Sequence, residues 1–194
     1  WPLSFTPEFM GLQRRGMGTA ILEAKLLMQL AFHGYRPLFQ IFLDLLTKAY
    51  DTLDRDHSIK TLQGYGPHVC HLISCIWEKL MLPLCASGFY GNVFHPECGV
   101  LQGDLDSPII FNIQMDCVIC EWMHITNNLS LVAVFYADNG QLAGYSPVSI
   151  QQGLDVFQSL FAHIGLHLNA DKTKTMILEC AQPYGAISLA AFKR

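Results

Sequence analysis

Two short apolar runs flank the sequence YADNG at residues 136–140, and this arrangement constrains the fold more than any other feature. The first run, residues 129–134, is apolar and partly β-branched, which is typical of a buried strand. The second run, residues 141–144, is short and mostly apolar. Asn139 and Gly140 predict a tight hairpin turn, because both residue types tolerate positive φ. Asp138 is then expected at the tip of a hairpin, where it forms either an ordinary Asx turn or a cation ligand.

The rest of the chain predicts an α+β protein. Beside the hairpin, we expect strands at residues 38–43, 84–90, 92–100 and 174–178, with the middle two joined near Gly91. We expect helices at residues 47–63, 68–82, 107–124 and 146–165, after an earlier one that begins at Thr19. Ser-Pro pairs open the last two, because Ser caps a helix and Pro suits its first position. This order predicts one sheet covered by helices.

A second carboxylate has the same sequence context as Asp138. Asp44 follows the apolar run at residues 38–43, as Asp138 follows the run that ends before it. Adjacent strands lie about 4.8 Å apart, so two carboxylates at strand ends can share one site. Like charges at that distance repel each other unless a cation lies between them. Oxygen ligands suit Mg²⁺, which binds substrate phosphates and assists phosphoryl transfer. The residues alone therefore suggest a Mg²⁺ site, with an ordinary turn as the alternative.

The distribution of charge bears on what such a site can bind. No Lys or Arg lies between Lys79 and Lys172. That interval contains eight acidic residues: Glu97, Asp104, Asp106, Asp116, Glu121, Asp138, Asp155 and Asp171. The sequence offers no basic stripe there for a phosphate backbone, which counts against nucleic-acid binding. The odd number of cysteines, seven, favours a reducing intracellular compartment. No apolar run reaches the ~18 residues needed to span a membrane, so we expect no membrane partner.

Five segments resemble, in order, motifs of the reverse transcriptases, which are RNA-directed DNA polymerases. The first catalytic motif is resembled by residues 42–51 (FLDLLTKAYD) and the second by residues 99–112 (GVLQGDLDSPIIFN). Residues 136–139 (YADN) resemble the third motif and residues 165–174 (GLHLNADKTK) the fourth. Residues 16–20 (GMGTA) resemble a segment that the family carries upstream, in the fingers. The five segments lie within about residues 8–178 and are most similar to the non-LTR retroelement and group II intron type.

The resemblance implies a catalytic group of residues. Asp44 and Asp138 would ligate Mg²⁺, with Mn²⁺ as the alternative ion, and the backbone carbonyl of Leu45 would reach the same metal. Asn139 occupies the position beside Asp138 in the catalytic motif. Lys172 would lie near the triphosphate and protonate the leaving pyrophosphate. The resemblance thus implies two-metal nucleotidyl transfer onto a primer–template.

The resemblance also implies residues that contact the substrates. Tyr50 would be the aromatic side chain that blocks a ribose 2′-OH and so selects deoxynucleotides. Gln102 and Gly103 would line the template and the incoming nucleotide. Arg14 and Arg15 would grip the template or the triphosphate. The implied partners are an RNA template, a DNA primer and deoxynucleoside triphosphates.

The fold implied by the resemblance is a polymerase palm, an antiparallel sheet covered by helices, with part of the fingers. We expect a fingers-like segment at residues 1–36 and the palm at residues 37–194. No stretch resembles the thumb, so we expect the chain to be part of a longer protein that supplies the thumb and other domains.

Three departures from the family pattern leave a second hypothesis open. Asn139 stands where the family has a second Asp, so a neutral amide replaces a charged ligand. Residues 104–108 read DLDSP where the family usually has Asp-Pro-Leu-Ser-Pro. Five residues separate Asp44 from Tyr50 where the family usually has four, which predicts a bulge or an irregular turn. The alternative is a catalytically inactive retroelement relic with a palm-like fold and weak nucleic-acid or partner binding.

The helix expected at residues 107–124 carries a second candidate for a metal site. Cys117, Cys120 and His124 lie at positions i, i+3 and i+7, which places them on one helix face. No second pair of ligands accompanies them, so we expect ordinary core thiols rather than a metal centre. Trp77, Trp122 and Phe111 are likewise expected in the core rather than as platforms for stacked bases.

Overall fold

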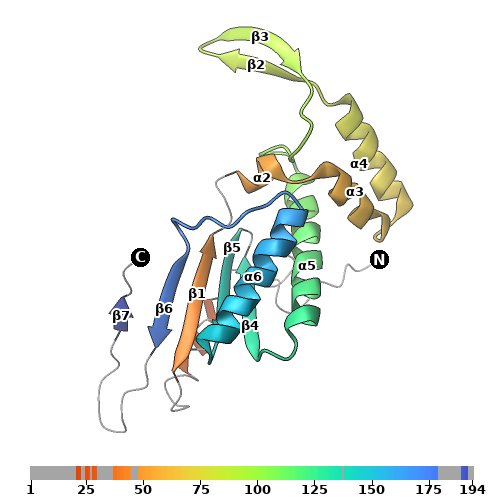
Figure 1. Ribbon diagram of the computed structural model, residues 1–194. Coiled ribbons are helices and arrows are strands. Elements are labelled where there is room, and N and C mark those ends of the chain that lie inside the picture. The colour runs from red at the N-terminus through yellow and green to blue at the C-terminus, as the bar shows by residue number, and fades with distance from the viewer. Residues whose placement is uncertain are drawn as a thin grey trace.

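A five-stranded antiparallel sheet forms the centre of the protein (Figure 1), with the strand order β4-β5-β1-β6-β7. The computed structural model describes residues 37–44, 48–136 and 138–178, helical residues at 21–22, 25–26 and 28–29, and the backbone of Leu189–Ala191. The strands of this sheet are β1 (Leu38–Asp44), β4 (Leu131–Tyr136), β5 (Asn139–Gly144), β6 (Lys174–Leu178) and β7 (Leu189–Ala191). Segments far apart in the chain therefore meet along β1, which pairs with both β5 and β6.

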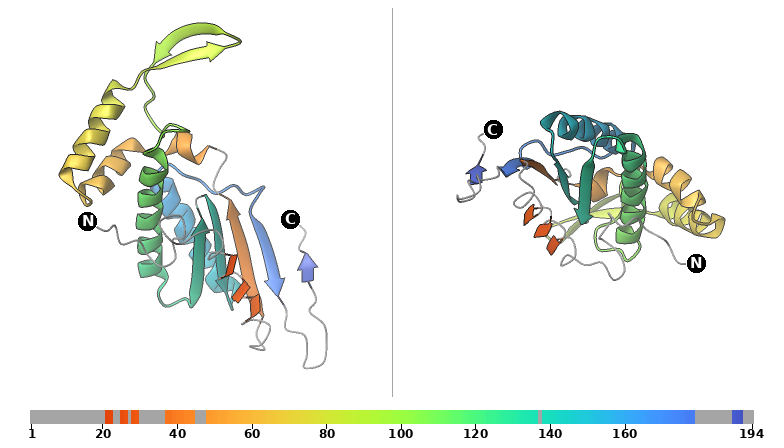
Figure 2. Two further views of the ribbon diagram at one scale, coloured as in Figure 1. Left: turned by 180° about the vertical axis from the view of Figure 1, so that it is seen from behind. Right: turned by 90° about the horizontal axis from the view of Figure 1, so that it is seen from below.

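Helices cover one face of the sheet. The helices of the described residues from 48 to 178 are α2 (Ala49–Thr52), α3 (Arg55–Gln63), α4 (Pro67–Lys79), α5 (Ser107–Thr126) and α6 (Pro147–His163). Of these, α5 and α6 lie beside the sheet, and α2, α3 and α4 lie beyond its end (Figure 1). In Figures 1 and 2, α5 and α6 lie on the same side of the sheet, while the helical residues at 21–22, 25–26 and 28–29 lie over the other side. Among the described residues, no helix has the length and apolar character needed to cross a membrane. The expected α+β class, a sheet covered by helices, is confirmed.

Aromatic side chains fill the layer between the sheet and its helices. Phe135 of β4 packs edge-on against Phe157 of α6, with ring centroids 5.2 Å apart. Trp122 of α5 stacks on the same Phe157 at 4.4 Å and donates its indole N–H to the Gly153 carbonyl at 2.8 Å. A Cβ at position 153 would lie 2.5 Å from Leu131, so glycine permits this close approach. The expectation of a core position for Trp122 is confirmed, because it is 2% exposed.

A second, two-stranded sheet extends away from this body at the top of Figure 1. It consists of β2 (Leu82–Ala86) and β3 (Phe89–Phe94), and nearly all of its residues are exposed. The prediction of a single sheet and of a joint near Gly91 was therefore wrong. The turn lies at Ser87-Gly88, where both residues have positive φ, 52° and 83°. Two such residues match the twist of the flanking strands.

The central hairpin forms, but its turn differs from the expectation. Tyr136 pairs with Asn139, so Asn139 already belongs to β5, and the turn residue before it is Asp138. Gly140 is needed for a different reason from the one predicted. A Cβ there would lie 2.4 Å from the ring of Phe135, so glycine leaves room for a core aromatic rather than for a turn.

Two helix boundaries also differ. The helix expected at residues 47–63 is divided into α2 and α3 at Leu53 and Asp54. The Asp54 carboxylate accepts the backbone N–H of His57 at 2.7 Å, so this residue caps a new helix instead of continuing the first. At α5 the capping position belongs to Asp106, and Ser107 is the first helical residue. The predicted cap at Ser146 is confirmed, because its hydroxyl accepts the Ser149 N–H.

Candidate active site

The candidate site lies where β1 ends and the β4–β5 hairpin turns. Asp44 is the last residue of β1, and its Cα partner across the ladder is Asn139, the first residue of β5. Asp138 lies in the connection just before Asn139. Side chains alternate along a strand, so Asp44 faces away from Leu43, which is buried in the core beneath the helices. Asp44 is thus directed to the side of the sheet opposite α5 and α6.

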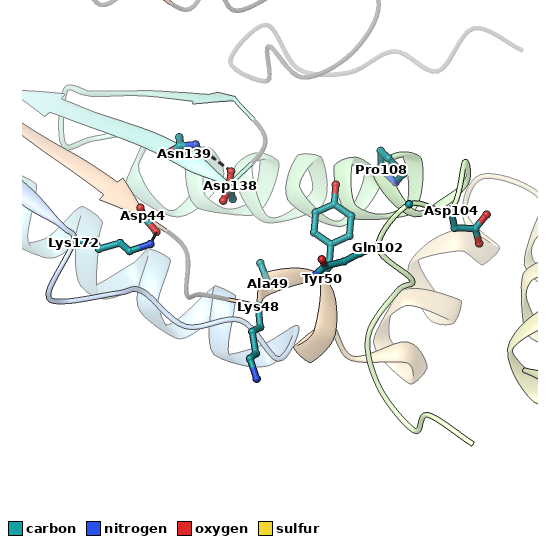
Figure 3. A pocket seen from close by; sticks show the side chains of 11 residues that line it. Asp44, Lys48, Ala49, Tyr50, Gln102, Asp104, Pro108, Asp138, Asn139 and Lys172 are labelled. Carbon is teal, nitrogen blue, oxygen red and sulfur yellow. Dashed lines mark hydrogen bonds and ion pairs between the residues drawn. The ribbon is translucent and has the colours of Figure 1, made fainter. Parts of the chain in front are cut away.

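A cleft of about 620 Å³ opens at this point. Its lining residues come from β1, α2, the loop before α5, the start of α5, the hairpin and the loop before β6: Asp44, Lys48, Ala49, Tyr50, Gln102, Gly103, Asp104, Pro108, Asp138, Asn139 and Lys172. Figure 3 shows how these side chains lie. The fold therefore brings together all the predicted site residues that it describes. Leu45, Arg14 and Arg15 lie outside the described residues.

Polar contacts link the charged side chains of the cleft. The Lys172 ammonium lies 3.8 Å from a carboxylate oxygen of Asp44. The Asn139 amide donates a hydrogen bond of 3.1 Å to the Asp138 carboxylate, drawn dashed in Figure 3. Asp44 is thus paired with an ammonium, whereas Asp138 accepts a hydrogen bond from a neutral amide. Half of the Lys172 side chain, 52%, is exposed, so water screens its attraction to Asp44.

The aromatic side chain implied for sugar discrimination does line the cleft. The Tyr50 ring stacks on Phe111 of α5, with centroids 4.9 Å apart and planes at 11°. Burial raises the pKa of the Tyr50 phenol above its ordinary value, and the negative charge of Asp138 raises it further. Lys48, just before α2, has a left-handed φ of 102°. The described part of the segment between Asp44 and Tyr50, which has one residue more than the family usually has, therefore shows the expected irregular turn. The Tyr50 ring nevertheless lines the cleft.

The loop that carries Gln102 and Gly103 is held against α2 by several hydrogen bonds. Val100 donates its N–H to the Tyr50 carbonyl at 2.6 Å, and Gly99 donates to the Leu53 carbonyl at 2.8 Å. The Gln102 side chain donates to the Asp51 carboxylate at 3.4 Å. A Cβ on Gly99 would lie 2.5 Å from the Asp51 carbonyl oxygen, so only glycine permits this contact. These contacts fix the distance between two walls of the cleft.

Arg55 holds the same loop by hydrogen bonds to its backbone carbonyls, and the sequence did not predict this role. Its guanidinium donates to the carbonyls of Gly99 and Pro96, the former at 2.8 Å. The guanidinium also lies over the Trp77 ring, 5.1 Å from the centroid. Burial lowers the pKa of Arg55. An arginine directly after a capping Asp gives no sequence signal for this role, because its partners lie about 40 residues further along the chain.

The donor atoms of the cleft fit a hard divalent cation. Asp44 and Asp138 offer carboxylate oxygens, which Mg²⁺ prefers, while Asp104 points away from them in Figure 3. Within the described part of the chain, no three His, Cys, Asp or Glu side chains converge as a metal-binding group. Two carboxylates would leave the remaining coordination positions of such an ion to water and substrate. Of the cysteines on α5, Cys117 is half-buried with its thiol 4.0 Å from the Tyr65 hydroxyl, whereas Cys120 is exposed, so the expectation of core thiols was wrong for Cys120.

The fold and the cleft together define a polymerase palm. Carboxylates from β1 and from a β-hairpin lie at one end of an antiparallel sheet whose far face carries helices. The chain belongs to the reverse transcriptase family, because the model of that family, Reverse transcriptase (RNA-dependent DNA polymerase), matches residues 29–185. Membership implies dependence on a divalent metal ion in general.

One curated relative supports this family assignment, and solved structures share the fold. The chain is 30% identical over 148 residues to the Retrovirus-related Pol polyprotein from type-2 retrotransposable element R2DM of Drosophila melanogaster, covering 73% of this chain and 14% of that protein. Among solved structures, it resembles the telomerase of Candida tropicalis in complex with a telomeric RNA fragment, with a TM-score of 0.69, 13% identity, and coverage of 88% of this chain and 30% of the other. The corresponding Candida albicans structure gives a TM-score of 0.67 and 15% identity, and the match covers 87% of this chain and 32% of the other. The chain therefore spans a third or less of these proteins.

Proposed function

We propose that this chain is the palm, with part of the fingers, of an RNA-dependent DNA polymerase that adds deoxynucleotides to a primer–template. The observation that carries the proposal is the meeting of Asp44, Asp138 and Lys172 in one cleft, although they come from three separate parts of the chain. Two carboxylates and an ammonium at one point suit a phosphoryl transfer, because charge develops on phosphate oxygens in that reaction.

Asp44 and Asp138 would hold the metal, Mg²⁺ or alternatively Mn²⁺, and the Leu45 carbonyl would add a further oxygen. The bound ion would neutralise negative charge on the reacting phosphate oxygens. Asn139 would offer a neutral oxygen where the family has a charged one. The Lys172 ammonium, at 3.8 Å from Asp44, would face the triphosphate and hold the proton that the leaving pyrophosphate needs.

The opposite wall of the cleft would select and orient the nucleotide. The Tyr50 ring, held by its stack on Phe111, would occupy the space of a ribose 2′-OH. Gln102 and Gly103 would contact the template and the incoming nucleotide. The hydrogen bonds between this loop and α2 support such a role, because they keep Gln102 and Gly103 at a fixed distance from Tyr50.

Contacts to the nucleic acid would come partly from elsewhere. Lys48 and Lys172 line the cleft, but the interval between Lys79 and Lys172 has no cation. We propose that Arg14 and Arg15, in a fingers-like segment at residues 1–36, and a thumb supplied by a longer protein grip the RNA template and the DNA primer. The palm would then occupy residues 37–194.

A primer-extension assay on an RNA template tests the proposal. The protein that contains this chain is supplied with deoxynucleotides and either Mg²⁺ or Mn²⁺. Extension that disappears in Asp44→Asn and Asp138→Asn supports the polymerase. An absence of extension with either ion, together with retained binding of primer–template, would support the inactive relic, to which the neutral Asn139 is the structural pointer.

A further inference from the structure

We infer that Asn169 is a positioning residue that sets the reach of Lys172 toward Asp44. This inference rests on the proposed function for its catalytic consequence, but its structural basis is independent of activity. Asn169 lies in the loop between α6 and β6, where its backbone N–H, its backbone carbonyl and its side-chain amide oxygen all form hydrogen bonds. It is half-buried and does not line the cleft itself.

The backbone of Asn169 ties the loop to β1. Its N–H donates to the carbonyl of Asp44 at 2.9 Å, which extends contact with β1 beyond the regular ladder. Its own carbonyl accepts the N–H of Thr173 at 2.8 Å and closes the turn that leads into β6. Asn169 is therefore fixed to Asp44 at the end of β1, and the turn from Asn169 to Thr173 starts from that fixed point.

The side chain of Asn169 shapes the turn that presents Lys172. Its amide oxygen accepts the backbone N–H groups of Asp171 and Lys172, at 3.1 and 3.3 Å. This Asx turn directs the chain so that the Lys172 side chain emerges beside Asp44, as Figure 3 shows for these two residues. Alanine at position 169 would leave both N–H groups without this acceptor.

The ion pair alone cannot hold Lys172 in place. The two atoms are 3.8 Å apart and more than half of the lysine side chain is exposed, so solvent weakens the attraction. A lysine side chain also has many rotamers. The position of the ammonium must therefore be limited by the backbone from which the side chain starts. Asn169 limits that backbone, and it does so from an anchor on Asp44 itself.

The first experiment measures the turn without any assay of activity. Amide hydrogen exchange at Asp171 and Lys172 is compared in wild type, Asn169→Ala, Asn169→Asp and Asp171→Ala. We expect exchange about tenfold faster in Asn169→Ala. We expect wild-type exchange in Asn169→Asp, because a carboxylate accepts the same N–H groups, and in Asp171→Ala, which keeps its backbone N–H. Unchanged exchange in Asn169→Ala would overturn the inference.

The second experiment tests the link to Lys172. Methylated Lys172 gives an NMR signal that should shift when Asp44 is changed to Asn. We expect this response to be lost in Asn169→Ala and restored in Asn169→Asp. In primer extension, Asn169→Ala should lower kcat about tenfold with KM for the nucleotide unchanged, and should add nothing to Lys172→Ala. A further loss in the double variant, or an intact NMR response in Asn169→Ala, would refute the role. Normal NMR responses in a protein without extension would refute the polymerase and leave the positioning role standing.

Discussion

Asp44 and Asn139 face each other as cross-strand partners at the end of β1 and the start of β5. One carries a charge and the other is a neutral amide that donates a hydrogen bond to Asp138. The Lys172 ammonium lies beside the Asp44 carboxylate, and the Asn139 amide lies beside the Asp138 carboxylate. A family member with Asp at this position would bring a third carboxylate to the same point, and its need for a cation would be greater.

Asn139→Asp should raise the affinity for Mg²⁺ at least tenfold, or about 1.4 kcal/mol. Without metal the same variant should melt at a lower temperature, because its new carboxylate faces Asp138 in place of an N–H donor. Calorimetric titration and melting with and without Mg²⁺ measure both effects. Asn139→Ala is the control, since it removes the hydrogen bond and adds no charge. Equal Mg²⁺ affinity in wild type and Asn139→Asp would exclude position 139 from the metal site.

Primer extension should remain slow in the same variant even though its affinity for Mg²⁺ has risen. If the missing charge contributes about 3–4 kcal/mol in the transition state, its absence lowers the rate by roughly two to three powers of ten. The extra residue before Tyr50 and the altered loop at Leu105 and Asp106 remain in the variant, and a displacement of about 1 Å can cost ~100-fold. Asn139→Asp should therefore restore metal binding before it restores primer extension. Rapid extension by the unmodified chain would contradict this view of Asn139.

Gly99→Ala should destabilise the protein by more than about 2 kcal/mol. Its φ is +78°, and an added Cβ would lie 2.5 Å from the Asp51 carbonyl oxygen in the contact that joins α2 to the loop before α5. Gly103→Ala is the matched control, because φ there is +91° and nothing lies within 4 Å. It should cost only the backbone strain, about 1 kcal/mol. Urea unfolding of both variants measures the difference, and equal losses would show that the contact is dispensable.

Alkaline pH should destabilise the protein through Tyr65. Burial raises the pKa of its phenol above the ordinary value of 10.0, and the neighbouring Cys117 raises it further. The folded state thus favours the neutral phenol, so this contribution is complete below pH 10 and is lost as the pH rises toward the folded-state pKa. The free energy of unfolding should fall above pH 10, and fall less steeply in Tyr65→Phe. Tyr90→Phe, on the exposed β2–β3 hairpin, is the matched substitution. Identical pH profiles for wild type and Tyr65→Phe would contradict the assignment.

Local patterns were sufficient for much of the fold and for the members of the site. Apolar runs predicted β1 and β4, and the short strand expected at residues 174–178 is β6. The family motifs predicted that Asp44, Tyr50, Gln102, Asp138 and Lys172 belong to one site, which no periodicity could have shown.

Contacts between distant segments were not predictable in the same way. The roles of Arg55 and Gly99, and the hydrogen bond from Asn169 to Asp44, depend on backbone groups far along the chain, and such bonds leave no periodic pattern in the sequence. The Asn139-Gly140 pair was misleading for a related reason. Glycine at 140 serves the packing of Phe135, a requirement of tertiary structure that resembles a turn signal when only neighbours in sequence are considered.

Tyr50 provides the most specific test of whether the cleft still selects deoxynucleotides. Tyr50→Phe keeps the ring and its stack on Phe111, so the fold and the preference for deoxynucleotides over ribonucleotides should both be retained. Tyr50→Ala removes the ring, and the preference should fall by at least tenfold, in binding as well as in incorporation, because a ribose 2′-OH would no longer meet it. The same variant should lose about 3 kcal/mol of stability through the vacated aromatic contact.

A control is needed to separate these two effects of Tyr50→Ala. Phe111→Leu disturbs the same stack and leaves the Tyr50 ring in the cleft, so it should reduce stability with a smaller effect on sugar preference. Binding of matched deoxy- and ribonucleoside triphosphates, followed by calorimetry, gives affinity without dependence on turnover. If Tyr50→Ala and Phe111→Leu change the preference equally, the ring acts only through packing. The extra residue between Asp44 and Tyr50 would then have cost the chain its sugar discrimination, even though the ring still lines the cleft.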